Sequence, residues 1–248
     1  MATIPAPVAE PQAAISPFGR IIGVLFSPKA TFEDIARKPS WLLPVLISTI
    51  LGIASTVVLN QRMDWRDYIT QQIEKSPRAA NLTAEQKQNQ VEISAKVTVY
   101  IVYLAGAIGS VCFAVIVGAV MMLAYNLLAG AGASFSQSLG IAAHSLVVGI
   151  VSTPIFLLVL LLRPRGSIDP ENPVATNLAA FLPEESAKWL LTLCKSIDLF
   201  TIWILVLLAI GFAAVNPKKL KSSKPYVVAF SVWGVVVAVK VLWAFVTS

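Results

Sequence analysis

The chain has 248 residues, of which 56% are hydrophobic and only 13% are charged. Soluble domains carry about 25% charged residues, so this composition excludes an ordinary soluble enzyme and also excludes disorder over most of the chain. The apolar residues lie in long runs, which indicates an all-α integral membrane protein. The net charge of +6 has no fold of a nucleic-acid reader around it, so we interpret it as lipid-surface charge and expect no nucleic-acid partner.

The N-terminal region divides into a tail and a short helical segment. Residues 1–16 are rich in Ala and Pro, without a signal-peptide pattern, and predict a flexible tail. Residues 20–38 then predict one or two short helices in the membrane interface, with Ser27 as N-cap and Pro28 at the first helical position. A soluble helix packed on the rest of the chain is the alternative. Residues 17–248 as a whole form the predicted membrane domain.

Five apolar runs follow that are long enough to cross a bilayer. A proline inside the third, Pro154, predicts a kink. The long polar link before the second span contains a capped helix start at residues 83–86. An amphipathic helix is predicted over residues 184–190, ahead of the fourth span. The predicted spans cover about residues 41–59, 99–125, 139–162, 197–215 and 226–246.

The positive residues indicate the orientation of the spans. An odd number of spans places the two termini on opposite sides of the membrane. The totals on the two sides are nearly equal, so the density of Lys and Arg near the span ends decides. The link at residues 216–225 carries the sharpest cluster, without an acid, and we place it and the N-terminus in the cytoplasm. The same cluster predicts contact with anionic lipid through Lys218, Lys219, Lys221 and Lys224.

Motifs for catalysis, nucleotide binding and metal binding are absent from the sequence. There is no H-E-x-x-H, no G-x-S-x-G, and no G-x-x-x-x-G-K-[ST] or G-x-G-x-x-G pattern. The single histidine, His144, cannot form a zinc site by itself, and a hydrogen bond across helices is its simpler use. Cys112 and Cys194 are interpreted as small hydrophobic residues. We therefore expect a non-enzymatic protein without a catalytic residue, cofactor or metal.

Two groups of residues within the spans could carry function. Lys195 and Asp198 are three residues apart at the start of the fourth span, where one helix face would hold both. They are either an ion or proton relay or a structural pair. The second span has a stripe of small residues, which favours close helix packing within the bundle or, alternatively, a homodimer. The stripe consists of Gly106, Ser110, Ala114 and Gly118.

Four segments together resemble prokaryotic members of the YIP (Ypt/Rab-interacting protein) domain family. The resemblance extends over roughly residues 18–246 and implies a five-span membrane domain with a cytoplasmic N-terminus. Eukaryotic members are associated with small GTPases and vesicle traffic. Their Asp-Leu-Tyr-Gly-Pro motif is missing here and the tail is short, so GTPase binding is not carried over. The segments are LFSPKATF (25–32), KPSWLLP (38–44), GASFSQSL (132–139) and IDLFTIW (197–203).

These observations favour a polytopic membrane protein that organises membrane, as a trafficking-type scaffold, or recruits partners. A small ion- or proton-coupled transporter or channel that uses Lys195 and Asp198 is the first alternative. An accessory subunit of a larger membrane complex is the second.

Overall fold

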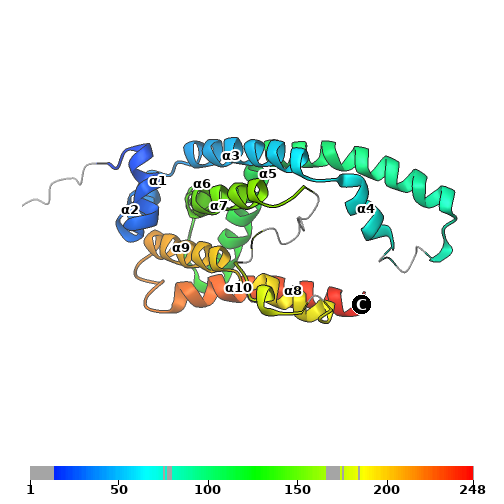
Figure 1. Cartoon of the computed structure of the whole chain (residues 1–248). Coiled ribbons are helices and arrows are strands. Elements are labelled where there is room, and N and C mark those ends of the chain that lie inside the picture. The colour runs from blue at the N-terminus through cyan, green and yellow to red at the C-terminus, as the bar shows by residue number, and fades with distance from the viewer. Residues whose placement is uncertain are drawn as a thin grey trace, which may run out of the picture.

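The computed structural model describes residues 14–74, 76, 80–165, 174, 176–183 and 185–247. Most of the predicted tail, residues 1–13, lies outside this range, as do Lys75, Arg78 and Glu184. The described residues form an all-helical chain, in which one isolated β-bridge joins Asn177 and Asp198. The helices in chain order are α1 (Pro17–Phe26), α2 (Pro28–Arg37), α3 (Leu42–Arg62), α4 (Trp65–Glu74), α5 (Ala84–Ala129), α6 (Phe135–Ser145), η2 (Leu146–Val148), α7 (Gly149–Leu162), η3 (Leu178–Phe181), α8 (Lys188–Ser196), α9 (Leu199–Val215) and α10 (Lys224–Val246) (Figure 1).

Four helical segments are long and apolar enough to cross a membrane. They are α3, α5, the run from α6 to α7, and α10. Helix α9 coincides with the fourth predicted span, but it has 17 residues and falls below the 18 residues that the other four exceed. At 1.5 Å per residue it is about 25 Å long, against a hydrocarbon core of about 30 Å. The chain is therefore an integral membrane protein with four long spanning candidates and one shorter apolar helix.

The second predicted span belongs to a much longer helix. Helix α5 has 46 residues, which corresponds to about 69 Å if it is straight. It begins where the sequence predicted a capped start: the Thr83 side chain accepts from Gln86 N, and the Gln86 side chain accepts from Thr83 N. Gly130 follows its last residue as the C-cap, with a φ of 61° in the left-handed region, which glycine adopts at little steric cost. Its N-terminal part packs against α4, where Arg66 and Glu92 approach to 3.6 Å.

The third predicted span is interrupted rather than simply kinked at its proline. Helix α6 ends at Ser145, a short 3₁₀ turn (η2) follows, and α7 resumes at Gly149. Pro154 lies inside α7, beyond this interruption. A proline removes one backbone N–H and crowds the preceding turn, so α7 must tolerate a local defect in addition to the 3₁₀ turn upstream of it.

Hydrogen bonds between sequence-distant segments define two ends of the bundle. At the α1–α2 end, Gln137 donates to Ala36 O at 2.9 Å, and Lys219 donates to Gly130 O at 2.9 Å. At the opposite end, Arg62 donates to Leu160 O at 2.8 Å, which joins the C-termini of α3 and α7. Figure 1 places α1 and α2 at one end and the C-terminus at the other. Helices α3, α5, α6–α7, α9 and α10 therefore run in alternating directions between the two ends.

Helix α5 is packed into the bundle through its small residues. A Cβ added at Gly52 of α3 would lie 2.9 Å from the carbonyl oxygen of Gly106, and one added at Gly118 would lie 3.2 Å from Leu139 Cα of α6. Ser110 and Thr49 share a hydrogen bond across the same α3–α5 contact. Further along α5, Tyr125 stacks on Phe212 of α9 at 4.1 Å between ring centroids. The predicted stripe thus lies against α3 and α6 of the same chain.

The close α3–α5 contact predicts opposite effects of the same substitution at two neighbouring glycines. In Gly106→Ala, the new Cβ would meet Thr56 at 2.6 Å and Gly52 O at 3.0 Å, and overpacking of this kind typically costs about 1–3 kcal/mol. In Gly109→Ala no heavy atom lies within 4 Å of the Cβ, so the better helix propensity of Ala should leave stability unchanged or raise it. Thermal unfolding in detergent measures both. Equal melting temperatures for the two variants would contradict the packing.

Candidate functional site: the cationic platform at the α1–α2 end

Helices α1 and α2 form a short hairpin whose boundaries follow from local chemistry. The Ser16 hydroxyl accepts from Gly19 N at 3.0 Å and caps α1, and prolines occupy the first position of each helix. Ser27 stands at the N-cap position of α2, as predicted, but its side chain makes no capping hydrogen bond. The two predicted short helices are therefore present, and Pro28 begins the second by its fixed φ rather than with help from the Ser27 hydroxyl.

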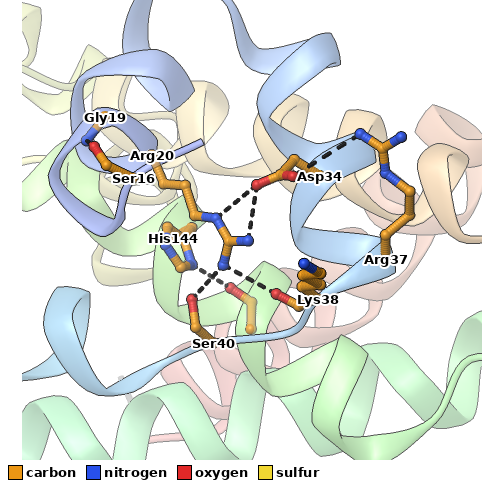
Figure 2. A network of polar contacts seen from close by, with 9 residues as sticks. Ser16, Gly19, Arg20, Asp34, Arg37, Lys38, Ser40 and His144 are labelled. Carbon is orange, nitrogen blue, oxygen red and sulfur yellow. Dashed lines mark hydrogen bonds and ion pairs between the residues drawn. The ribbon is translucent and has the colours of Figure 1, made fainter. Parts of the chain in front are cut away.

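A buried ion pair joins the two helices of this hairpin. The Arg20 guanidinium contacts Asp34 Oδ2 through Nε and Nη2, each at 2.8 Å (Figure 2). The two side chains are only 7% and 4% exposed. Two charges removed from water in this way are each costly unless they remain together and hydrogen-bonded. The pair therefore fixes how α1 lies against α2.

The same guanidinium also holds the link into the first spanning helix. Arg20 Nη1 donates to Lys38 O at 2.9 Å and to Ser40 Oγ at 2.7 Å. His144 of α6 lies beside this network and is almost fully buried, with its Nδ1 2.8 Å from Gly140 O (Figure 2). The described partner of His144 is thus on its own helix, and not across helices as the sequence suggested.

Sequence reasoning did not identify Arg20 and Asp34 as a pair. The signal was a charged residue within the apolar stripe of each short helix: Arg20 lies beside Ile21 and Val24, and Asp34 lies beside Phe32 and Ile35. A charge at a core-facing position needs a partner. The pairing itself depends on how the hairpin closes, which the helical periodicity does not specify.

The outer surface of the hairpin is apolar on α1 and charged on α2. Phe18, Ile22 and Phe26 are exposed along α1, Phe26 at 81%. Helix α2 exposes Lys29, Glu33 and Arg37. Such a surface suits the membrane interface, where rings enter the acyl boundary and cations meet headgroups.

The lysine-rich link between α9 and α10 lies at the same end. Asn216 donates to Ala131 O at 3.1 Å, which together with the Lys219 bond attaches this link to the turn after α5. All four lysines of the link are exposed. We call the exposed cations of this end the cationic platform: Lys29, Arg37, Lys38, Lys218, Lys219, Lys221 and Lys224.

Lys195 and Asp198 do not lie on one helical face. Helix α8 ends at Ser196 and α9 begins at Leu199, so the helix is interrupted between Lys195 and Asp198. Asp198 is the N-cap of α9: Oδ1 accepts from Phe200 N and Thr201 N, each at 3.0 Å, and Oδ2 accepts from Thr176 Oγ1. The prediction of a shared face was wrong because it assumed one continuous helix. An aspartate favours a helix start, since its carboxylate accepts hydrogen bonds from the free backbone N–H groups of the first turn.

Thiols and metal-ligating side chains are dispersed. Cys112 and Cys194 are free cysteines. Within the part of the chain that the structure describes, no three His, Cys, Asp or Glu side chains come together as a metal site.

The buried ion pair predicts that removing one charge lowers stability strongly and that removing the second charge as well restores it. Asp34→Asn leaves Arg20 buried without a counter-charge, and breaking a buried pair from one side costs about 3–5 kcal/mol in soluble proteins. The double variant Arg20→Met/Asp34→Leu removes both charges and should recover most of that loss. Arg37→Gln, at the exposed edge, should change stability by less than about 1 kcal/mol. Thermal unfolding in detergent tests the set, and a double variant no more stable than Asp34→Asn would argue against the pair.

The chain is similar in sequence to a known membrane protein and to one protein-family model. The chain is 26% identical over 191 residues to membrane protein YknW of Bacillus subtilis (strain 168), which covers 77% of this chain and 76% of that protein. No solved structure matches the chain. The family model described as the Yip1 domain matches residues 22–245, from α1 to the last turn of α10. Since that match covers nearly the whole chain and agrees with the resemblance in its sequence, the protein belongs to the Yip1 domain family.

Proposed function

We propose that this protein is a non-enzymatic, five-span membrane scaffold that gathers anionic lipid and membrane partners at its cationic platform. The observation that carries the proposal is the attachment of the platform to the bundle. The Arg20–Asp34 pair, the Lys219–Gly130 bond and the Gln137–Ala36 bond hold its segments to one another. A surface held in this way can present a fixed arrangement of charges to a membrane or to another protein.

Electrostatics support the lipid part of the proposal. The platform has seven exposed cations, and Glu33 is the acid exposed among them on α2. Each Lys or Arg near an anionic leaflet contributes about 1 kcal/mol of attraction. The exposed Phe18, Ile22 and Phe26 would enter the interface of the same leaflet, which combines the two forces that hold amphipathic helices on membranes.

The five-span arrangement is supported by the bonds at both ends of α9. Its first residues follow Asp198, which is tied to Thr176 and Asn177 near α8. Its last residues lead to Asn216, which is bonded to Ala131 at the platform end. Seventeen residues lie at the short limit of spanning helices, and a bilayer can thin locally to match. In this proposal α1, α2 and the lysine-rich link lie on the cytoplasmic side, where positive residues near span ends concentrate.

The proposed topology predicts opposite locations for the two termini. Reporter domains fused before Met1 and after Ser248 should respond from the cytoplasm and from the other side, respectively. Cysteines introduced at Arg165 and Lys221, on a background without the two native cysteines, should differ in the same way towards an impermeant thiol reagent. Termini on one side, with Arg165 and Lys221 also on one side, would mean that α9 does not cross.

The platform predicts a selective loss of anionic lipid when its free lysines are neutralised. We expect Lys218→Gln/Lys221→Gln/Lys224→Gln to lower the enrichment of anionic lipid that co-purifies with the protein, because about 1 kcal/mol per lysine is lost. Lys219 is kept because its ammonium bonds Gly130 O. The matched control, Lys87→Gln/Lys96→Gln/Arg165→Gln, neutralises three cations at the opposite end. Analysis of the lipids that co-purify after mild solubilisation measures this enrichment. An equal loss of anionic lipid from both variants would count against a localised site.

A further inference from the structure

A cavity of about 220 Å³ lies between helices of the bundle. Its walls come from α3, α5, the α6–η2–α7 segment and Ile204 of α9. Leu146 begins the 3₁₀ turn, Gly149 directly follows it, and both line the cavity, so the cavity forms where the third apolar segment departs from regular α-helix. A cavity of about 150 Å³ lined by apolar side chains can already hold a benzene ring, so this one has room for a small group and part of a chain.

The cavity wall carries hydroxyl groups that the protein leaves without partners. Ser48 of α3 and Ser152 and Thr153 of α7 line it, and none of the three side chains makes a hydrogen bond in the described structure. Two other hydroxyls of α3 have partners: Thr49 shares a bond with Ser110, and Ser55 donates to Leu51 O. A hydroxyl without a partner in a hydrocarbon environment costs free energy. The three groups therefore favour an occupant that supplies hydrogen bonds.

The charge of the wall and the position of the cavity narrow the occupant further. None of the lining residues has an ionisable side chain, so a charged headgroup would find no counter-charge there. Ser48 follows the start of α3 by six residues, or about 9 Å along the helix. Phe113 of α5 also lines the cavity and is 56% exposed. The cavity thus meets the bilayer sideways, at a depth below that of phospholipid headgroups and on the platform side.

We propose that this cavity is a binding site for an uncharged glycerolipid with a free hydroxyl, the chemistry of a diacylglycerol. Such a lipid has a small head that can sink below the phospholipid headgroups. Its hydroxyl can donate to and accept from the serines and the threonine, and its ester oxygens can accept from them. Its acyl chains remain among the exposed apolar side chains of α5. The site is independent of the cationic platform, which recognises the opposite kind of headgroup.

The test uses photoreactive lipids and the full-length protein in phospholipid vesicles. Photoreactive diacylglycerol, its 3-O-methyl ether and photoreactive phosphatidylglycerol, with identical chains, are added at equal mole fraction. We expect diacylglycerol to label residues 42–62 and 149–162 most strongly. The methyl ether should label them about threefold less, which is the effect of one intramembrane hydrogen bond. Equal labelling by all three lipids would overturn the proposal, because it would mean that any acyl chain enters.

Two variants separate occupancy of the cavity from labelling of the outer surface. Gly149 lines the cavity and a Cβ there has no heavy atom within 4 Å, so the side chain of Gly149→Leu starts in open space and takes up part of the cavity. Gly234→Leu is the matched control, because Gly234 is equally open but lies on α10 outside the cavity. Diacylglycerol labelling should fall about tenfold or more in Gly149→Leu, because the leucine takes space that the lipid needs and so lowers its affinity. Labelling should stay unchanged in Gly234→Leu. Unchanged labelling in Gly149→Leu would refute the site.

A third variant keeps the space and removes the hydrogen bonds. Ser48→Ala/Ser152→Ala/Thr153→Val preserves the approximate shape of the wall. It should abolish the preference for diacylglycerol over its methyl ether while both still label. A retained preference in this variant, with a melting temperature equal to that of the wild type, would overturn the assignment of the hydroxyls.

Discussion

The ion pair between Arg20 and Asp34 is the constraint on which the arrangement of the α1–α2 end depends. Each charge lies at a position where its helix otherwise packs apolar residues, so neither helix can dock without bringing its charge into a protected environment. Val24, Phe32 and Ile35 enter the same core cluster as Tyr125 and Phe212. Hydrophobic burial supplies an attraction that has no direction, and the two guanidinium nitrogens that meet Asp34 Oδ2 supply the orientation.

That orientation determines which surfaces remain for other molecules. Once Arg20 faces Asp34, the apolar residues Phe18, Ile22 and Phe26 point away from the core, and the cations of α2 lie at the same end as the lysine-rich link. The Arg20 bonds to Lys38 O and Ser40 Oγ carry the same constraint into the start of α3. The surface that we propose as a lipid and partner platform is therefore a consequence of a contact that is itself hidden.

Helix α5 organises the rest of the bundle through a series of small residues. Gly106 admits the backbone of α3, and Gly118 admits that of α6. These two glycines of α5 are therefore packed against helices of the same chain. Where α6 gives way to the 3₁₀ turn before α7, the helices do not close on one another, and the hydroxyl-lined cavity results.

The sequence by itself determined the membrane class, the Yip1 resemblance, the approximate position of each apolar helix and the capped start of α5. These features depend on composition and on interactions within a few residues, which the order of residues specifies directly. Tertiary structure decided the Arg20–Asp34 pair, the bond between Thr176 and Asp198, and the packing of the small-residue stripe against α3 and α6. It also decided the presence of the cavity. Each of these depends on which segments meet, and residues 14, 22 or 101 positions apart become neighbours only after the chain has folded. Periodicity identifies the face that a helix buries, but the partner of that face is set by packing among all the helices.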